Sequence, residues 1–121
     1  MKAVQVILAL GSNTNQERNI REAKQALSRL LPDIVFYEEM WTEPVGISSD
    51  RFLNCVARAH TTTPLATLRR QIKKIELSLG NKDHDTNTVN IDIDLLQYGS
   101  HRYKEEDWKR DYVAKCRNFE M

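Results

Sequence analysis

Two aspartates set one residue apart are the residues of this chain whose type and spacing most directly suggest chemistry. Asp92 and Asp94 alternate with Ile91, Ile93 and Leu95, and strict alternation with apolar residues predicts a half-buried strand. Successive side chains of a strand point to opposite faces, so the two carboxylates share one face. Close carboxylates raise each other's pKa unless a cation lies between them, and Mg²⁺ is commonly held by one or two carboxylates. The pair leaves two interpretations open, a magnesium site and a solvated strand face neutralised by lysines.

The composition is that of an ordinary globular protein and argues against several classes of function. The 121 residues fit a single domain over residues 1–121, with 40% hydrophobic and 29% charged residues. A formal net charge of +1 argues against a nucleic-acid-binding surface, and no apolar run reaches membrane-spanning length. The first residues lack a signal-peptide pattern, and Cys55 lies in an apolar run typical of a core residue. We therefore expect a cytoplasmic protein without nucleic-acid or membrane partners.

The elements that must position the aspartates follow from hydrophobic periodicity. Strands are predicted over Val4–Leu10, Ile34–Thr42, Phe52–Thr62 and the aspartate stretch up to Gly99, and helices over Gln16–Leu31 and from Pro64 to a stop at Gly80. The order strand, helix, strand, strand, helix, strand indicates an α+β, ferredoxin-like βαββαβ fold, with an antiparallel sheet and both helices packed on one face. Proteins with this fold have many different functions, so the fold alone does not identify the function of this chain.

The segments between these elements are expected to be turns and loops. Gly11–Asn13 is predicted to end the first strand in a turn, and Asn13, Thr14 or Asn15 to cap the first helix. Thr63 is the expected cap of the second helix, with Pro64 at its first position. Residues 80–90 are polar and predict a mobile loop without regular structure, and residues 104–115 favour a short helix or an irregular segment.

Several sequence blocks, in order along the chain, resemble the 6-hydroxymethyl-7,8-dihydropterin pyrophosphokinase family. They are Leu10-Gly11-Ser12-Asn13, Thr42-Glu43-Pro44-Val45-Gly46 followed by Phe52-Leu53-Asn54, Ile75-Glu76-Leu77-Ser78-Leu79-Gly80, and Asp92-Ile93-Asp94-Leu95-Leu96-Gln97-Tyr98-Gly99. The resemblance implies transfer of the β,γ-pyrophosphoryl unit of ATP to the 6-hydroxymethyl oxygen of the pterin, with AMP as the other product.

The resemblance also implies a role for individual residues. Asp92 and Asp94 would bind two Mg²⁺ ions that hold the ATP phosphates, and Lys82 would be the catalytic cation of the preceding loop. The residues implied to bind the pterin are Thr42, Val45, Phe52, Asn54 and Phe119, and those implied to bind the nucleotide are Lys73, Glu76, Tyr112 and Arg117. Considered without the family, Asn54 reads as a strand-end residue bonded to its own backbone, Phe119 as a core aromatic, Glu76 as a solvated charge, and Tyr112 and Arg117 as surface residues.

The chain departs from the family pattern in the loop before the aspartates. Residues 80–90 contain no arginine and no tryptophan, so Lys82 is the main cation there, with His84 as a second. Arginine holds phosphate bidentately whereas lysine supplies a point charge, so we expect reduced turnover. Asp111 stands where the family carries a nucleotide-contacting histidine, and the chain ends soon after Phe119, as in a C-terminally short member. A sheet edge exposed by that shortening would favour a homodimer.

Two other functions remain open at this point. A pterin- or nucleotide-binding homologue without fast chemistry is favoured by the missing loop arginines. A metal-dependent phosphotransferase acting on another heteroaromatic alcohol is the weaker alternative.

Overall fold

The computed structural model describes residues 2–43, 51–80, 82–83 and 88–104. The elements are β1 (Val4–Ser12), α1 (Gln16–Leu30), β2 (Val35–Phe36), β3 (Met40–Thr42), β4 (Phe52–Thr61), α2 (Leu65–Ser78), β5 (Lys82–Asp83), β6 (Thr88–Val89), β7 (Asp92–Tyr98) and β8 (His101–Arg102). Among these residues no helix combines the length and apolar character needed to cross a membrane.

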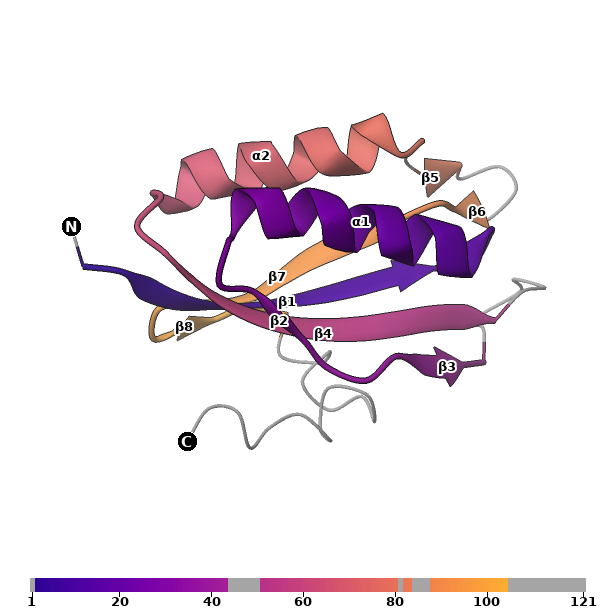
Figure 1. Cartoon of the computed structure of the whole chain (residues 1–121), viewed down its shortest axis with the longest axis horizontal. Coiled ribbons are helices and arrows are strands. Elements are labelled where there is room, and N and C mark those ends of the chain that lie inside the picture. The colour runs from indigo at the N-terminus through magenta and orange to yellow at the C-terminus, as the bar shows by residue number, and fades with distance from the viewer. Residues whose placement is uncertain (1, 44–50, 81, 84–87, 105–121) are drawn as a thin grey trace.

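The main sheet is antiparallel and carries both helices on one face (Figure 1). Its strand order is β2-β4-β1-β7-β8, and β3 pairs with the same strand, β4, as β2 does. β1 is central because it pairs with β4 on one side and with β7 on the other. The ferredoxin-like arrangement expected from the order of the elements is confirmed.

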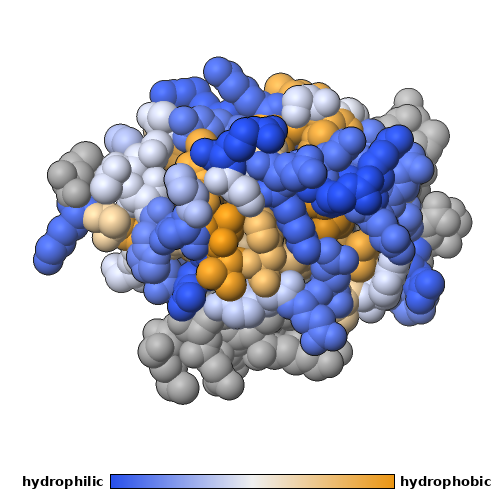
Figure 2. All heavy atoms as spheres, in the orientation of Figure 1, coloured by the Kyte–Doolittle hydropathy of each residue, from blue (hydrophilic) through white to orange (hydrophobic). Residues whose placement is uncertain are grey.

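The core lies between the sheet and the two helices. It contains the expected stripes of both helices together with every second residue of the long strands, namely Val6, Leu8, Leu10, Ile20, Ala23, Leu27, Leu31, Leu53, Cys55, Ala57, Ala59, Leu68, Ile72, Ile91, Ile93 and Leu95. A smaller buried cluster of Ile7, Ala9, Val56 and Leu96 lies on the opposite face. Hydrophilic side chains dominate the visible surface, with hydrophobic atoms showing between them near its centre (Figure 2). Strand alternation thus assigns each residue of β1, β4 and β7 to one of two faces.

The strand predictions need three corrections. β1 continues through Gly11 and Ser12, because these residues pair with Asn54 and Leu53 of β4 rather than forming a turn. The predicted strand Ile34–Thr42 is divided into β2 and β3. The N–H of Tyr37, which lies between them, still donates to the Val56 carbonyl of β4.

The third strand correction concerns residues 80–90, which the sequence predicts to lack regular structure. In that segment, Lys82 pairs with Val89 and Asp83 with Thr88, forming a short second sheet. The chain pattern gave no signal for this pairing, because two-residue strands show no hydrophobic alternation.

The helix ends also differ from expectation by small steps. Asn15 is the N-cap of α1 but its side chain makes no capping hydrogen bond, and its backbone is left-handed with φ 43°. Instead, the side-chain Nδ2 of Asn19 donates to the backbone carbonyl of Thr14 at 2.7 Å. Pro64, predicted as the first helical residue of α2, is its N-cap, the position that the sequence predicts for Thr63. The backbone N–H of Thr63 donates to the Thr61 hydroxyl at 3.0 Å.

The base of the β5–β6 hairpin is tied to the rest of the fold on two sides. The Asn13 N–H donates to the Val89 carbonyl at 3.0 Å, and the Val89 N–H donates to Asn13 Oδ1 at 2.6 Å. On the other side, Asn90 Nδ2 donates to the Leu79 carbonyl at 3.1 Å. Gly80 has φ +103° and a Cβ there would lie 2.2 Å from Asn90 Nδ2, so a side chain at this position would strain the backbone and displace the Asn90 amide. These bonds fix the entry into β7, which begins with Asp92.

Candidate active site

The two aspartates occupy the start of β7 and share the sheet face that carries no helix. Ile91, Ile93 and Leu95 are buried against the helices, whereas Asp92 and Asp94 alternate with them and are half-buried. Lys104 Nζ lies 3.1 Å from Asp94 Oδ1. The backbone of Lys104 is in the left-handed region, with φ 51°. The alternation predicted from the sequence is confirmed, and a lysine does lie beside one of the two carboxylates.

The donor set of this pair fits a magnesium ion. Within the described residues no group of three or more His, Cys, Asp or Glu side chains could hold a metal ion. Among the residues that the structure describes, Asp92 and Asp94 are the two carboxylates that share this face of β7. This is the pattern of Mg²⁺, which keeps most of its coordination shell for water and substrate phosphates.

Asn54 and Thr42 lie next to each other on β4 and β3. Asn54 Nδ2 donates to Thr42 Oγ1 at 2.8 Å and to the Met40 carbonyl at 3.1 Å, with a longer contact of 3.4 Å to the Phe52 carbonyl. The donor end of the amide is therefore used within the protein. Its Oδ1 accepts no hydrogen bond from the described part of the chain, so this buried amide presents an acceptor to a ligand.

A single row across three strands joins the Asn54 side to the aspartate side. Gly11 of β1 pairs with Asn54 of β4 and with Asp92 of β7, so these three residues are in register. Neighbouring strands lie about 4.8 Å apart, which places Asn54 and Asp92 about 10 Å from each other. A Cβ on Gly11 would lie 3.4 Å from Asn54 Oδ1 and 3.6 Å from Phe52 Cδ1. Because Gly11 has no side chain, the sheet surface between Asn54 and Asp92 carries no side-chain atoms at this position.

Glu76 is buried, which excludes the interpretation of it as a solvated charge. It is 8% exposed, and its Oε2 accepts a hydrogen bond from the Ile93 N–H at 2.7 Å. Burial raises the pKa of this carboxyl above its ordinary value; the Ile93 N–H opposes that rise and the negative charge of Asp92 adds to it. Lys73 Nζ lies 3.8 Å from the other oxygen and is mostly exposed.

A cavity of about 480 Å³ opens along the edge of β7 beneath α2. It is lined by Arg69, Ile72, Lys73, Glu76, Ile93, Asp94, Leu95, Tyr103 and Lys104. The Arg69 guanidinium lies 4.8 Å from the centre of the Tyr103 ring. The cavity therefore combines an apolar wall, an aromatic ring that packs against an arginine, and two lysines beside two acidic residues.

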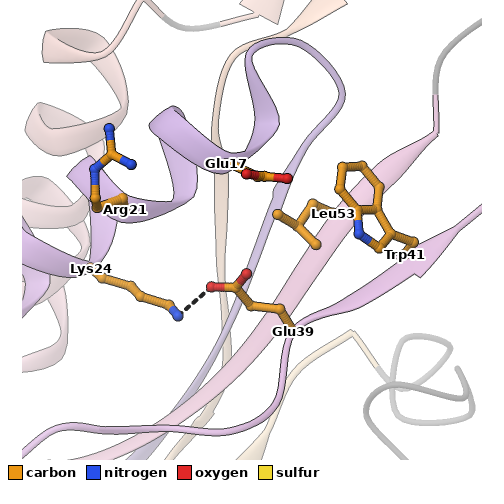
Figure 3. A pocket seen from close by; sticks show the side chains of 6 residues that line it. All are labelled: Glu17, Arg21, Lys24, Glu39, Trp41 and Leu53. Atoms are coloured by element: carbon orange, nitrogen blue, oxygen red, sulfur yellow. Dashed lines mark hydrogen bonds and ion pairs between the residues drawn. The ribbon is translucent and has the colours of Figure 1, made fainter.

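A second cavity of about 450 Å³ lies on the helix side of the sheet (Figure 3). Its lining comes from α1, from β3 and the residue before it, and from β4: Glu17, Arg21, Lys24, Glu39, Trp41 and Leu53. Lys24 and Glu39 form an ion pair across it, drawn as a dashed line in Figure 3. It includes none of the residues expected from the sequence to bind substrate.

The structure brings together some of the expected residues and does not reach others. Phe52, Asn54 and Thr42 are neighbours, and Lys73, Glu76 and Asp94 line one cavity. The backbone of Lys82 lies in β5. Val45, Tyr112, Arg117 and Phe119 lie outside the described residues, as does most of the segment 104–115.

Four residues of the site were not singled out from the sequence. Gly11 was noted only as part of a family block, and its place between Asn54 and Asp92 follows from strand register, which the sequence does not specify. Arg69, Tyr103 and Lys104 carried no signal, because each is an ordinary polar residue in a helix or after a short strand.

Comparison with known proteins agrees with the geometry. The family model for 7,8-dihydro-6-hydroxymethylpterin-pyrophosphokinase (HPPK) matches residues 7–117, which is most of the chain. No curated protein matches the sequence.

Proposed function

The chain belongs to the HPPK family, whose members transfer pyrophosphate from ATP to hydroxymethyldihydropterin in folate synthesis, and we propose that it carries out this transfer with Mg²⁺ on the helix-free face of its sheet. The observation that carries the proposal is the row Asn54–Gly11–Asp92. A heterocycle held at the Asn54 end and a polyphosphate held at the Asp92 end meet above Gly11. Phosphoryl-type transfer depends mainly on such positioning and on neutralising charge.

The pterin side is proposed to use the free acceptor of Asn54. Pterin rings carry N–H donors, and Asn54 Oδ1 is an acceptor held in place by three contacts of its own Nδ2. Thr42 positions this amide by accepting its shortest bond, at 2.8 Å. Phe52 supplies an apolar wall, and Val45 and Phe119 are proposed as further walls by analogy with the family.

The nucleotide side is proposed to be the cavity along β7. Its apolar residues, Ile72 and Leu95, and the Tyr103 ring would receive the adenosine, and Lys73 and Lys104 would face the phosphates. Asp92 and Asp94 would hold two Mg²⁺ ions, which when bound neutralise phosphate charge and align the phosphate chain. By analogy with the family, Tyr112 and Arg117 complete the nucleotide contacts and Lys82 places a cation near the transferred group.

The reaction breaks one bond and forms one. The hydroxymethyl oxygen of the pterin attacks the β-phosphorus of ATP, the bond from that phosphorus to the oxygen bridging the α-phosphate breaks, and AMP leaves. The hydroxyl proton passes to solvent. Asn54 and Thr42 orient the alcohol for this attack, and the carboxylates of β7 set the position of the phosphates.

One observation favours a second function, that of a binding protein with little turnover. Residues 80–90 contain no arginine, and a cation placed on transition-state charge contributes on the order of 10²–10³ in rate. Loss of such cations affects turnover more than binding. We therefore propose an active enzyme of reduced rate and keep the binding homologue as the alternative.

The deciding experiment measures AMP release from ATP and Mg²⁺ with and without 6-hydroxymethyl-7,8-dihydropterin. AMP formed only in the presence of the pterin supports the transfer reaction. Binding of both ligands without AMP would establish the binding homologue. AMP release that does not depend on the pterin would indicate a different phosphotransferase or hydrolase.

A further inference from the structure

Glu76 is a buried carboxylate that the transfer reaction just described does not use. Removing a carboxylate from water costs free energy unless hydrogen bonds replace the lost hydration. At 8% exposure Glu76 has one short bond, 2.7 Å from its Oε2 to the Ile93 N–H, and a loose ion pair of 3.8 Å with Lys73. The strongest contact of this residue is therefore with the backbone of β7.

That backbone position lies between the two aspartates. Ile93 separates Asp92 from Asp94, and β7 pairs with β1 along this stretch. On the other side of β7, β8 pairs only with Gln97 and Tyr98. In the described part of the chain, the acidic stretch of β7 thus has no neighbouring strand on that side, and the Glu76 carboxylate accepts the hydrogen bond that a strand carbonyl would otherwise accept.

Glu76 is also not placed as a third metal ligand. No group of three acidic, His or Cys side chains among the described residues could hold a metal ion. Its Oε2 accepts from the Ile93 N–H, and α2 carries it to the edge of β7, where its carboxyl also shares a hydrogen bond with the Asp92 side chain. The bond from the Ile93 N–H satisfies one oxygen of this buried carboxyl.

Building on the proposed function, we propose that Glu76 is a positioning residue that accepts the outward-facing N–H of Ile93 and holds the backbone between Asp92 and Asp94 in the geometry that binds the Mg²⁺–nucleotide complex. This role is separate from the direct nucleotide contact that the family resemblance implies for Glu76, which also lines the proposed nucleotide cavity. Removing a group that orients metal ligands through hydrogen bonds, without itself contacting the metal, typically lowers metal affinity about 10- to 100-fold.

Two substitutions of Glu76 separate the effect of its hydrogen bond with the Ile93 N–H from the effect of its negative charge. Glu76→Gln keeps an oxygen that can accept from the Ile93 N–H but carries no charge. Glu76→Ala removes both. Lys73→Ala is the control for Ile93 exchange alone, because it removes the ion pair on the same helix face and leaves the bond to Ile93; its nucleotide affinity is not compared, since Lys73 is itself proposed to face the phosphates.

Three quantities are measured for each variant: the hydrogen-exchange rate of the Ile93 amide without ligand, the melting temperature, and the affinity for a non-hydrolysable ATP analogue with Mg²⁺ by calorimetry. We expect Glu76→Ala to speed Ile93 exchange about tenfold and to weaken the analogue about 10- to 100-fold. Glu76→Gln should stay within about threefold of the wild type in both, and Lys73→Ala should leave Ile93 exchange unchanged.

Two results would overturn the inference. Equal loss of affinity in Glu76→Gln and Glu76→Ala would mean that the charge matters and that Glu76 acts as a ligand. Unchanged Ile93 exchange in Glu76→Ala would remove the strand-supporting role, and if that variant does not fold, the Glu76→Gln measurements decide by themselves. A wild-type protein that does not bind the Mg²⁺–analogue complex would refute the proposed function instead, while Ile93 exchange would still test the strand contact.

Discussion

Replacing Gly11 with alanine should separate the pterin side of the site from the nucleotide side. The glycine has no positive φ, so the backbone accepts alanine, and a strand glycine is roughly 0.5–1 kcal/mol less favourable than alanine. The added methyl would lie 3.4 Å from Asn54 Oδ1 and 3.6 Å from Phe52, a tight but tolerable fit. The free energy of unfolding should therefore change by less than about 1 kcal/mol, whereas the methyl should obstruct Asn54 Oδ1, the acceptor proposed for the pterin.

The size of the binding effect follows from that obstruction. A donor of the pterin that is desolvated without reaching its acceptor costs about 1–3 kcal/mol, or about 5- to 150-fold in affinity. The methyl has no contact with Asp92 within 4 Å, so affinity for the Mg²⁺–nucleotide analogue should not change. That affinity is the internal control for correct folding.

A double-mutant cycle shows whether the effect passes through Asn54. Pterin affinity is measured by calorimetry for the wild type, Gly11→Ala, Asn54→Ala and the double variant. If the methyl acts by blocking Asn54 Oδ1, it should add little once that oxygen is gone. Wild-type pterin affinity in Gly11→Ala, or fully additive losses in the double variant, would refute the assignment of Asn54 as the pterin acceptor.

Three further outcomes are expected elsewhere in the chain. Asp92→Asn combined with Asp94→Asn should abolish Mg²⁺-dependent nucleotide binding with the fold intact by circular dichroism, and unchanged affinity would show the metal assignment to be wrong. The backbone N–H of His60, with a smaller contribution from its ring, lowers the pKa of Asp33 below 3.8, so this bond stabilises the protein at higher pH and is lost as the pH falls below that value. The melting temperatures of wild type and Asp33→Asn should accordingly differ at neutral pH and converge as the pH falls through the lowered pKa of Asp33, and parallel curves would exclude the bond as a source of stability. Asn13→Ala should remove the side-chain acceptor of the Val89 N–H in β6, cost about 1–3 kcal/mol in the free energy of unfolding, and speed exchange of that amide; unaltered exchange would contradict this.

The fold was largely predictable because its long elements carry strong periodic patterns. The stripe Ile20, Ala23 and Leu27 is buried as expected, and the alternation around Asp92 and Asp94 assigns their faces correctly. Periodicity reports which face of an element is buried, and in a two-layer fold that decides most of the packing.

The rest depended on contacts between distant segments. Glu76 appeared to be a solvated charge by its position on α2, yet it is buried because the edge of β7 supplies a hydrogen-bond donor at residue 93. The β5–β6 pairing and the division of the second strand involve stretches of only two or three residues. Such short elements are set by tertiary hydrogen bonds, for which a single sequence has no periodic signal.

The central position of β1 explains why the two sides of the site belong together. One strand pairs with β4, which carries Asn54, and with β7, which carries the aspartates, so its register sets both at once. A one-residue shift on either side would turn a whole row of side chains to the other face of the sheet. The same strand runs on into Asn13, which bonds the base of the hairpin before β7. In the proposed reaction, the distance between the bound alcohol and the bound phosphate is therefore set by the backbone pairing of β1, which makes Gly11, rather than any charged residue, the position where a small change should most selectively uncouple the two ligands.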